Sequence, residues 1–198
     1  YGELEALAGI SLSIGAGELT NFLQPGSLSA VLNRVTGGDP SAIYGTLQAN
    51  GQVFLINPNG VLVGPGGVVN TQGFVASTLD VDNDAFLAGG DLLFTGDSLS
   101  GVDNQGSISA LGGDVVMIAH TVSNSGDISA SEGTAALAAG SEVLYKPLDD
   151  ERVFVQAGGS ETADVGVDQT GQIQAAAAEL KAAGGNVYGL AINNEGVV

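Results

Sequence analysis

A short motif that recurs through the second half of the chain constrains its fold more than any other feature. The segment NQGSISA at residues 104–110 returns as NSGDISA at residues 124–130. Weaker copies follow as QTGQIQA at residues 169–175 and NEGVV at residues 194–198. A period of about 20 residues is typical of stacked structural repeats, in which each repeat buries its apolar face against its neighbours.

Each copy begins with an Asn–Gly type of corner and then alternates apolar with polar residues, which predicts a half-buried β-strand. The alternation places Ile108, Ile128 and Ile173 inside. Glycine adopts positive φ at a corner without steric cost, and stacked asparagines can form a side-chain ladder.

A second apolar run follows the first three copies and predicts a second face for each coil. These runs lie at residues 115–119, 135–139 and 186–192. We therefore expect an all-β fold, a single-stranded parallel β-helix (β-solenoid) with coils of about 20 residues and small extra-helical turns. One domain spans residues 1–198.

Three segments need separate interpretation. Residues 175–183 have high intrinsic helix propensity, but they fall inside the repeat period, so we favour a strand over a helix. Residues 80–87 predict a turn or a short capped helix, and residues 146–151 an exposed loop between a strand ending near Tyr145 and a strand at residues 152–156.

Charge and composition exclude several classes of partner. Acidic residues outnumber basic ones 22 to 4, and the resulting net charge of −18 repels nucleic acid and anionic lipid. Cysteine is absent, which removes disulfides and thiolate metal sites. No apolar stretch approaches the roughly 20 residues of a membrane span, so we expect no membrane insertion.

Residues 32–41, LNRVTGGDPS, and residues 45–60, GTLQANGQVFLINPNG, resemble the N-terminal secretion domain of filamentous haemagglutinin and high-molecular-weight adhesins. The resemblance continues through residues 61–64 and 69–80 and covers roughly a third of the chain, from Asn21 to about Gly90. It implies a right-handed parallel β-helix. It also implies two-partner secretion of a large exoprotein through an outer-membrane β-barrel transporter. The block at residues 1–90 would carry the secretion motifs and residues 91–198 further coils.

Two blocks match the signatures of that family. Asn57, Pro58, Asn59 and Gly60 form the first, and proline at a central turn position fixes φ while Asn and Gly take the remaining turn conformations. These residues either are required for recognition by the transporter or hold a coil corner needed for folding. We favour the second interpretation, also for the other block, which comprises Asn33, Thr36, Gly37 and Gly38.

The resemblance implies a non-enzymatic secretion and folding domain of an exported bacterial surface protein, which we expect to be a piece of a longer chain. The alternative is a structural β-solenoid that self-associates into an extracellular filament or matrix. A host receptor, another cell-surface receptor or a glycan is a further possible partner. The location is extracellular or on the bacterial surface, and we expect no cofactor.

Several other residues are weaker candidates for a metal-binding or catalytic site. Asp80, Asp82 and Asp84 imitate part of a calcium loop, but Ala85 stands where the sharp turn requires glycine, so a solvated turn is favoured. His120 is the single histidine and is interpreted as solvent-facing or hydrogen-bonded. A polysaccharide-active β-helix enzyme would need paired carboxylates. Its candidates recur near coil corners: Asp97, Asp103, Asp114 and Asp127.

Overall fold

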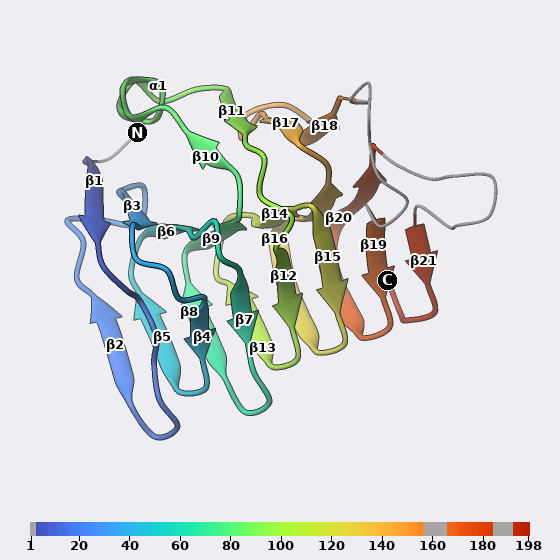
Figure 1. Cartoon of the computed structure of the whole chain (residues 1–198), viewed down its shortest axis with the longest axis horizontal. Coiled ribbons are helices and arrows are strands. Elements are labelled where there is room, and N and C mark those ends of the chain that lie inside the picture. Colours follow the sequence, from blue (N-terminus) through green and yellow to red (C-terminus); the bar gives the residue numbers. More distant parts are fainter. Residues whose placement is uncertain (1–2, 157–165, 184–191) are drawn as a thin grey trace.

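The structure is a computed structural model that describes residues 3–156, 166–183 and 192–198. The chain winds into a parallel β-helix, and successive coils follow one another along the long axis of the molecule (Figure 1). Strands at equivalent places in successive coils pair in parallel and build three faces. The all-β, parallel β-helix expected from the sequence is therefore confirmed.

The three faces are made of short strands and two long ones. The first face contains β1 (Leu4–Gly9), β3 (Ala30–Val35), β6 (Gln52–Ile56), β9 (Gly73–Ser77), β14 (Val115–Ala119) and the second parts of β16 (Asp127–Ala139) and β20 (Gln172–Ala182). The second face contains β2 (Leu19–Phe22), β5 (Thr46–Ala49), β8 (Val68–Thr71), β13 (Ser107–Ala110) and the first parts of β16 and β20. The third face contains β4 (Ser41–Ile43), β7 (Val61–Val63), β12 (Gly101–Asn104), β15 (Thr121–Asn124), β19 (Gly166–Gln169) and β21 (Ile192–Asn194).

The recurring motif sets the register of these stacks. Ile108 pairs with Ile128, and Ile128 with Ile173, so the three isoleucines form one inward row. All three are at most 3% exposed. The apolar runs at residues 115–119 and 135–139 are also stacked in register, in β14 and β16. The run at residues 186–192 lies mostly outside the described residues.

An amide ladder runs beneath the corners between the third and second faces. Asn104 donates from Nδ2 to Oδ1 of Asn124 at 2.7 Å, across a sequence separation of 20 residues. Asn124 donates from Nδ2 to Oε1 of Gln169 at 2.7 Å, across 45 residues. All three side chains are fully buried. The ladder expected from stacked asparagines is thus confirmed, with glutamine as its third member.

The outer side of the first face carries a second layer of structure. A four-stranded antiparallel sheet, here called the side sheet, comprises β10 (Asp80–Val81), β11 (Leu92–Thr95), β17 (Glu142–Tyr145) and β18 (Val153–Val155). Helix α1 (Asn83–Ala88) follows β10 (Figure 1). Phe86 of α1 packs edge-on against Phe54 of β6, with ring centroids 5.2 Å apart. The first face consequently buries apolar side chains on both sides.

From the sequence we expected small turns outside the coils, and a turn or short capped helix at residues 80–87, but the side sheet was not anticipated. Its central pairing joins Leu92–Thr95 to Glu142–Tyr145 in antiparallel register. No local pattern reveals such a pairing, because two complete coils intervene between the partner strands. Two segments leave the coils to form the side sheet, at residues 80–95 and 142–155, and each lengthens the coil that contains it. The second segment lies between Asn124 and Gln169, which explains why these residues are 45 positions apart in the sequence.

The three segments interpreted individually agree with the structure. Residues 175–183 are extended, within and just after β20, rather than helical. Asp82 caps α1, and its carboxylate accepts a hydrogen bond from the Ala85 backbone N–H at 2.9 Å. Residues 146–151 connect β17 to β18 by a turn, as expected.

Replacing Asn124 by alanine removes the middle member of the amide ladder. The Gln169 side-chain carbonyl would stay buried without its partner, and the Asn104 amide would keep only its 3.3 Å contact with the Asp127 carbonyl, so we expect the free energy of unfolding to fall by about 3 kcal/mol. Urea titration measures this change. Asn193→Ala is the control, because the Asn193 amide bonds Asp168 on the exposed surface. Equal losses for both variants would contradict this account of the ladder.

Candidate functional site

Residues 57–60 form a tight turn between β6 and β7. The Gly60 N–H donates to the Asn57 carbonyl at 3.0 Å, and the Asn59 N–H donates to the Asn57 side chain at 2.9 Å. Gly60 has φ of +117°, a conformation that residues with a β-carbon rarely adopt. The sequence NPNG therefore supplies the side-chain acceptor and the glycine that this turn requires, and a proline whose φ suits it.

The turn is also bonded to the preceding coil. The buried Asn57 amide donates to the Asp39 carbonyl and to Oγ of Ser41, each at 3.0 Å. The Asn59 amide donates to the Gly37 carbonyl at 2.8 Å. Two motif blocks that are separate in the sequence consequently lie in direct contact at one corner of the helix.

The following coil covers the other side of the turn. Oγ of Ser98 donates to the Pro58 carbonyl at 2.6 Å, and Gly60 lies beside the backbone of Gly101. We call residues 36–41, 57–60 and 98–101 the corner stack. Within it Asn57 and Gly60 are buried, whereas Pro58 is exposed and Asn59 half-buried. No local sequence signal reveals the contact with Ser98, which lies 40 residues away.

The other motif block, Asn33 and residues 36–38, is bonded in turn to the coil before it. The Thr36 backbone N–H and hydroxyl both bond the Gly9 carbonyl, at 2.8 and 3.1 Å. A β-carbon on Gly37 would lie 2.1 Å from the Ile10 carbonyl oxygen, so only glycine fits there. Asn33 lies apart from the corner stack, in β3, where it pairs with Leu7 and Leu55 on the neighbouring strands.

Asn57→Ala should destabilise the fold, because it removes two buried donor contacts and the acceptor for the Asn59 N–H. We expect a loss of about 3 kcal/mol in the free energy of unfolding. Pro58→Ala changes an exposed residue of the same turn and should lose less than about 1 kcal/mol. Urea titration of both variants checks the difference, and a small loss for Asn57→Ala would refute the structural role of its side chain.

The weak calcium candidates serve other purposes. Asp80 forms an ion pair with Arg34 at 2.8 Å, and Asp82 caps α1. Asp84 lies in the first turn of that helix. Within residues 3–156, 166–183 and 192–198, no group of three or more His, Cys, Asp or Glu side chains is placed to hold a metal ion.

The other candidate residues also have structural environments. His120 lies directly after β14 and is buried, at 8% exposure, so the expectation of a solvent-facing side chain is wrong. Asp103 lies in β12 and Asp127 in β16, on different faces, while Asp97 is exposed before β12. Asp114 accepts hydrogen bonds from the Thr134 N–H at 2.8 Å and from the Tyr145 hydroxyl at 2.9 Å.

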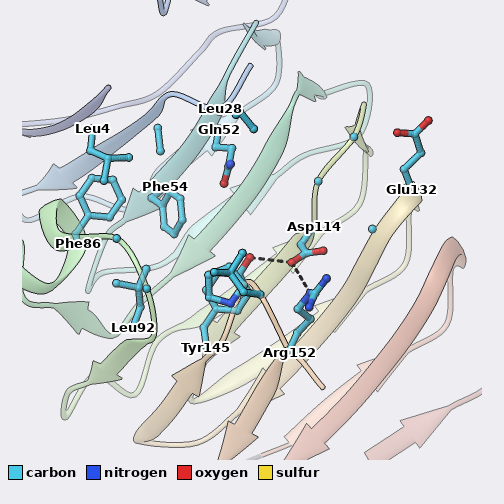
Figure 2. Close-up of a pocket in the computed structure, with 18 residues that line it drawn as sticks. Leu4, Leu28, Gln52, Phe54, Phe86, Leu92, Asp114, Glu132, Tyr145 and Arg152 are labelled. Atoms are coloured by element: carbon cyan, nitrogen blue, oxygen red, sulfur yellow. Dashed lines mark hydrogen bonds and ion pairs between the residues drawn. The ribbon is translucent and has the colours of Figure 1, made fainter. Parts of the chain in front are cut away.

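Asp114 belongs to a network that joins the side sheet to three successive coils. Figure 2 shows its contacts with Tyr145 and Arg152. Nε of Arg152 donates to Asp114 at 3.0 Å, and the Arg152 backbone N–H donates to Glu179 at 2.7 Å. Lys181 forms ion pairs with Glu179, at 3.0 Å, and with Glu151. The loop between β17 and β18 is thereby fixed to β20 as well as to the corner before β14.

The pKa values of this network follow from its contacts. Burial raises the pKa of Glu179, but the N–H groups of Arg152 and Val153 and the Lys181 ammonium outweigh it, and the pKa falls below its ordinary 4.5. Burial lowers the pKa of Lys181, but hydrogen bonds to Glu151 and Glu179 outweigh it and hold the pKa above 10.5.

The depressed pKa of Glu179 predicts a specific loss of stability in acid. Its contribution is fully present above pH 4.5 and is lost as the pH falls through the lower folded-state pKa. Glu179→Gln should therefore flatten the acid side of a plot of unfolding free energy against pH. Glu132→Gln, at an exposed position, is the control and should leave that slope unchanged. Identical slopes for Glu179→Gln and the parent chain would contradict the prediction.

Comparisons with known proteins place this geometry in context. A family model described as the TPS secretion domain matches residues 11–198. The HMW1 secretion domain from Haemophilus influenzae has a crystal structure similar to this one, with 32% sequence identity and a TM-score of 0.73. The similarity covers 85% of this chain and 47% of that one.

Two curated proteins, both named heme/hemopexin-binding protein and both from Haemophilus influenzae, match a shorter region. One, from strain ATCC 51907 / DSM 11121 / KW20 / Rd, is 46% identical and the other 43% identical, each over 72 residues. That region is 36% of this chain and 8% of either protein. In the part of the chain that the structure describes, no helix is long and apolar enough to cross a membrane.

Proposed function

Because this chain belongs to the TPS secretion domain family, we propose that it directs its parent exoprotein to an outer-membrane transporter through the exposed part of the corner stack. The family is a non-catalytic secretion module of large proteins exported by two-partner secretion. Such proteins are secreted across the outer membrane with the help of a dedicated transporter. The alternative of a polysaccharide-active domain is accordingly not supported.

The observation that carries the proposal is the division of the NPNG turn into two parts. Asn57 and Gly60 are buried and hold the corner, whereas Pro58 is exposed and Asn59 half-buried. The exposed residues Gly38, Asp39 and Pro40 of the preceding coil lie beside this turn, because Asn57 bonds the Asp39 carbonyl. Together they form a small surface of defined shape, composed of turn residues whose backbones are held in place.

The same architecture suits stepwise folding outside the cell. Each coil pairs with the preceding one through parallel hydrogen bonds and adds an apolar row to a continuous interior. A coil that has emerged can therefore fold on the previous coil before the next one arrives. We propose that this gain in stability per coil favours outward movement without a separate energy source.

Recognition and folding can be separated by exporting variants through the cognate transporter. Pro58→Ala should lower the amount of secreted protein severalfold while leaving the free energy of unfolding nearly unchanged. Pro65→Ala is the matched control, because Pro65 is an exposed proline in the turn between β7 and β8, away from the corner stack. Immunoblots of culture medium and cells measure the secreted fraction.

Normal secretion of Pro58→Ala, and also of the double variant with Asp39→Ala, would refute recognition by the exposed part of the corner stack. A parallel loss of secretion and stability in both variants would instead assign these residues to folding alone.

A second candidate role is permanent self-association on the cell surface or in an extracellular filament. It is favoured by β1 and β2, which each pair with one strand among the described residues, β3 and β5 respectively. Exposed leucines at this end of the helix, Leu19 and Leu23, are 60% and 85% exposed. Unpaired strand edges next to apolar side chains can pair with another chain. Sedimentation of the purified protein at rising concentration tests this role.

A further inference from the structure

A cavity of about 350 Å³ opens between α1, the side sheet and the outer side of the first face (Figure 2). Phe54 and Phe86 form an apolar end. Leu28 and Leu148 also line the cavity, yet they are 64% and 75% exposed. Phe54 and Phe86 are already buried, at 5% and 3% exposure, so an apolar group that packs on them would mainly remove Leu28 and Leu148 from water, which is the main source of affinity at such a surface.

The opposite end of the cavity is acidic. Asp114 and Arg152 line it, but they neutralise one another through their ion pair. Glu132 also lines it and is exposed, and within the described part of the chain its carboxylate has no hydrogen bond or ion pair. Figure 2 shows Glu132 and Asp114 on the side of the cavity away from Phe54 and Phe86. The cavity therefore presents one unneutralised negative charge at a fixed distance from an apolar end.

Strand register determines that distance. Phe54 of β6 pairs with Val75, Val75 with Val116, and Val116 with Ala136 of β16. Glu132 lies four residues before Ala136 in β16, so the two ends are about 14 Å apart across the strands and about 13 Å apart along them, which gives roughly 19 Å in all. An extended peptide advances about 3.3 Å per residue, so a step of about six residues bridges the two ends.

We propose that this cavity binds a short extended segment of a partner protein, with an apolar side chain against Phe54 and Phe86 and a basic side chain at Glu132. The two side chains lie six residues apart in the bound segment, so both point to the same face of the extended chain. The net charge of −18 favours approach of such a basic segment from a distance. This proposal is independent of the corner stack, which lies on a different part of the coils, and its test does not require export.

The test uses the whole chain, isotope-labelled for amide NMR, and the peptide acetyl-Phe-Gly-Ser-Gly-Ser-Gly-Lys-amide as probe. Addition of the peptide should shift the amide signals of Phe54, Phe86 and Leu148 together, with saturation at one dissociation constant. Two control peptides carry one change each, glycine in place of phenylalanine or glutamate in place of lysine. Both should bind at least about tenfold more weakly, because each loses one end of the interaction.

Two variants assign the binding to the cavity. Leu148→Ser should raise the dissociation constant about tenfold, while Leu99→Ser, at a 73% exposed leucine outside the cavity, should leave it unchanged. Glu132→Gln should remove the preference for lysine over glutamate, and Glu195→Gln, at an exposed acid in the C-terminal coil, should keep it.

Equal binding of all three peptides, or an affinity that Leu148→Ser and Glu132→Gln leave unchanged, would overturn the proposal. So would shifts of amide signals confined to other faces of the helix. None of these results would bear on secretion through the corner stack, because the peptide and the transporter are assayed separately.

Discussion

The parallel register between successive coils is the constraint on which the rest of the structure depends. Each residue of a strand lies beside its equivalent in the next coil, as in the row formed by Ile108, Ile128 and Ile173. A shift of one residue would turn every inward side chain outward. Register is therefore held at the corners as well as along the strands. The buried amides of Asn104, Asn124 and Gln169 bond one another from coil to coil, and a shifted coil would break these bonds in a buried place.

Close stacking also decides which residues can occupy the corners. A β-carbon on Gly126 would lie 2.2 Å from the Gly106 carbonyl oxygen, and one on Gly171 would lie 2.1 Å from that of Gly126. The repeated glycine of the sequence motif is thus required by the coil beneath it.

Longer segments that leave the coils fold back and cover the surface of the β-helix. The side sheet does so over the first face, and the contacts of Arg152 with Asp114 and Glu179 fix it across several coils.

This dependence explains what could be predicted from the sequence. Inward residues such as Ile108 and Ile128 recur in the sequence at a short, constant period, so both the strands and their stacking could be predicted from the sequence. The strand at residues 175–183 was also predictable, because its place in the period outweighed its helix propensity. The side sheet was not, since β11 pairs with β17 across two intervening coils. The same holds for the corner stack, where the contact between Pro58 and Ser98 spans 40 residues.

The NPNG turn shows why a family motif need not be assigned to folding or to recognition alone. Asn57 contributes its whole side chain to neighbouring backbone groups and hydroxyls, so its identity is explained by folding. That requirement does not extend to the Pro58 ring, which is exposed and which other residues could replace at an open turn position. A rigid turn held from both sides presents this ring in one orientation, at little entropic cost on binding. The buried half of the motif thus makes the exposed half suitable for recognition.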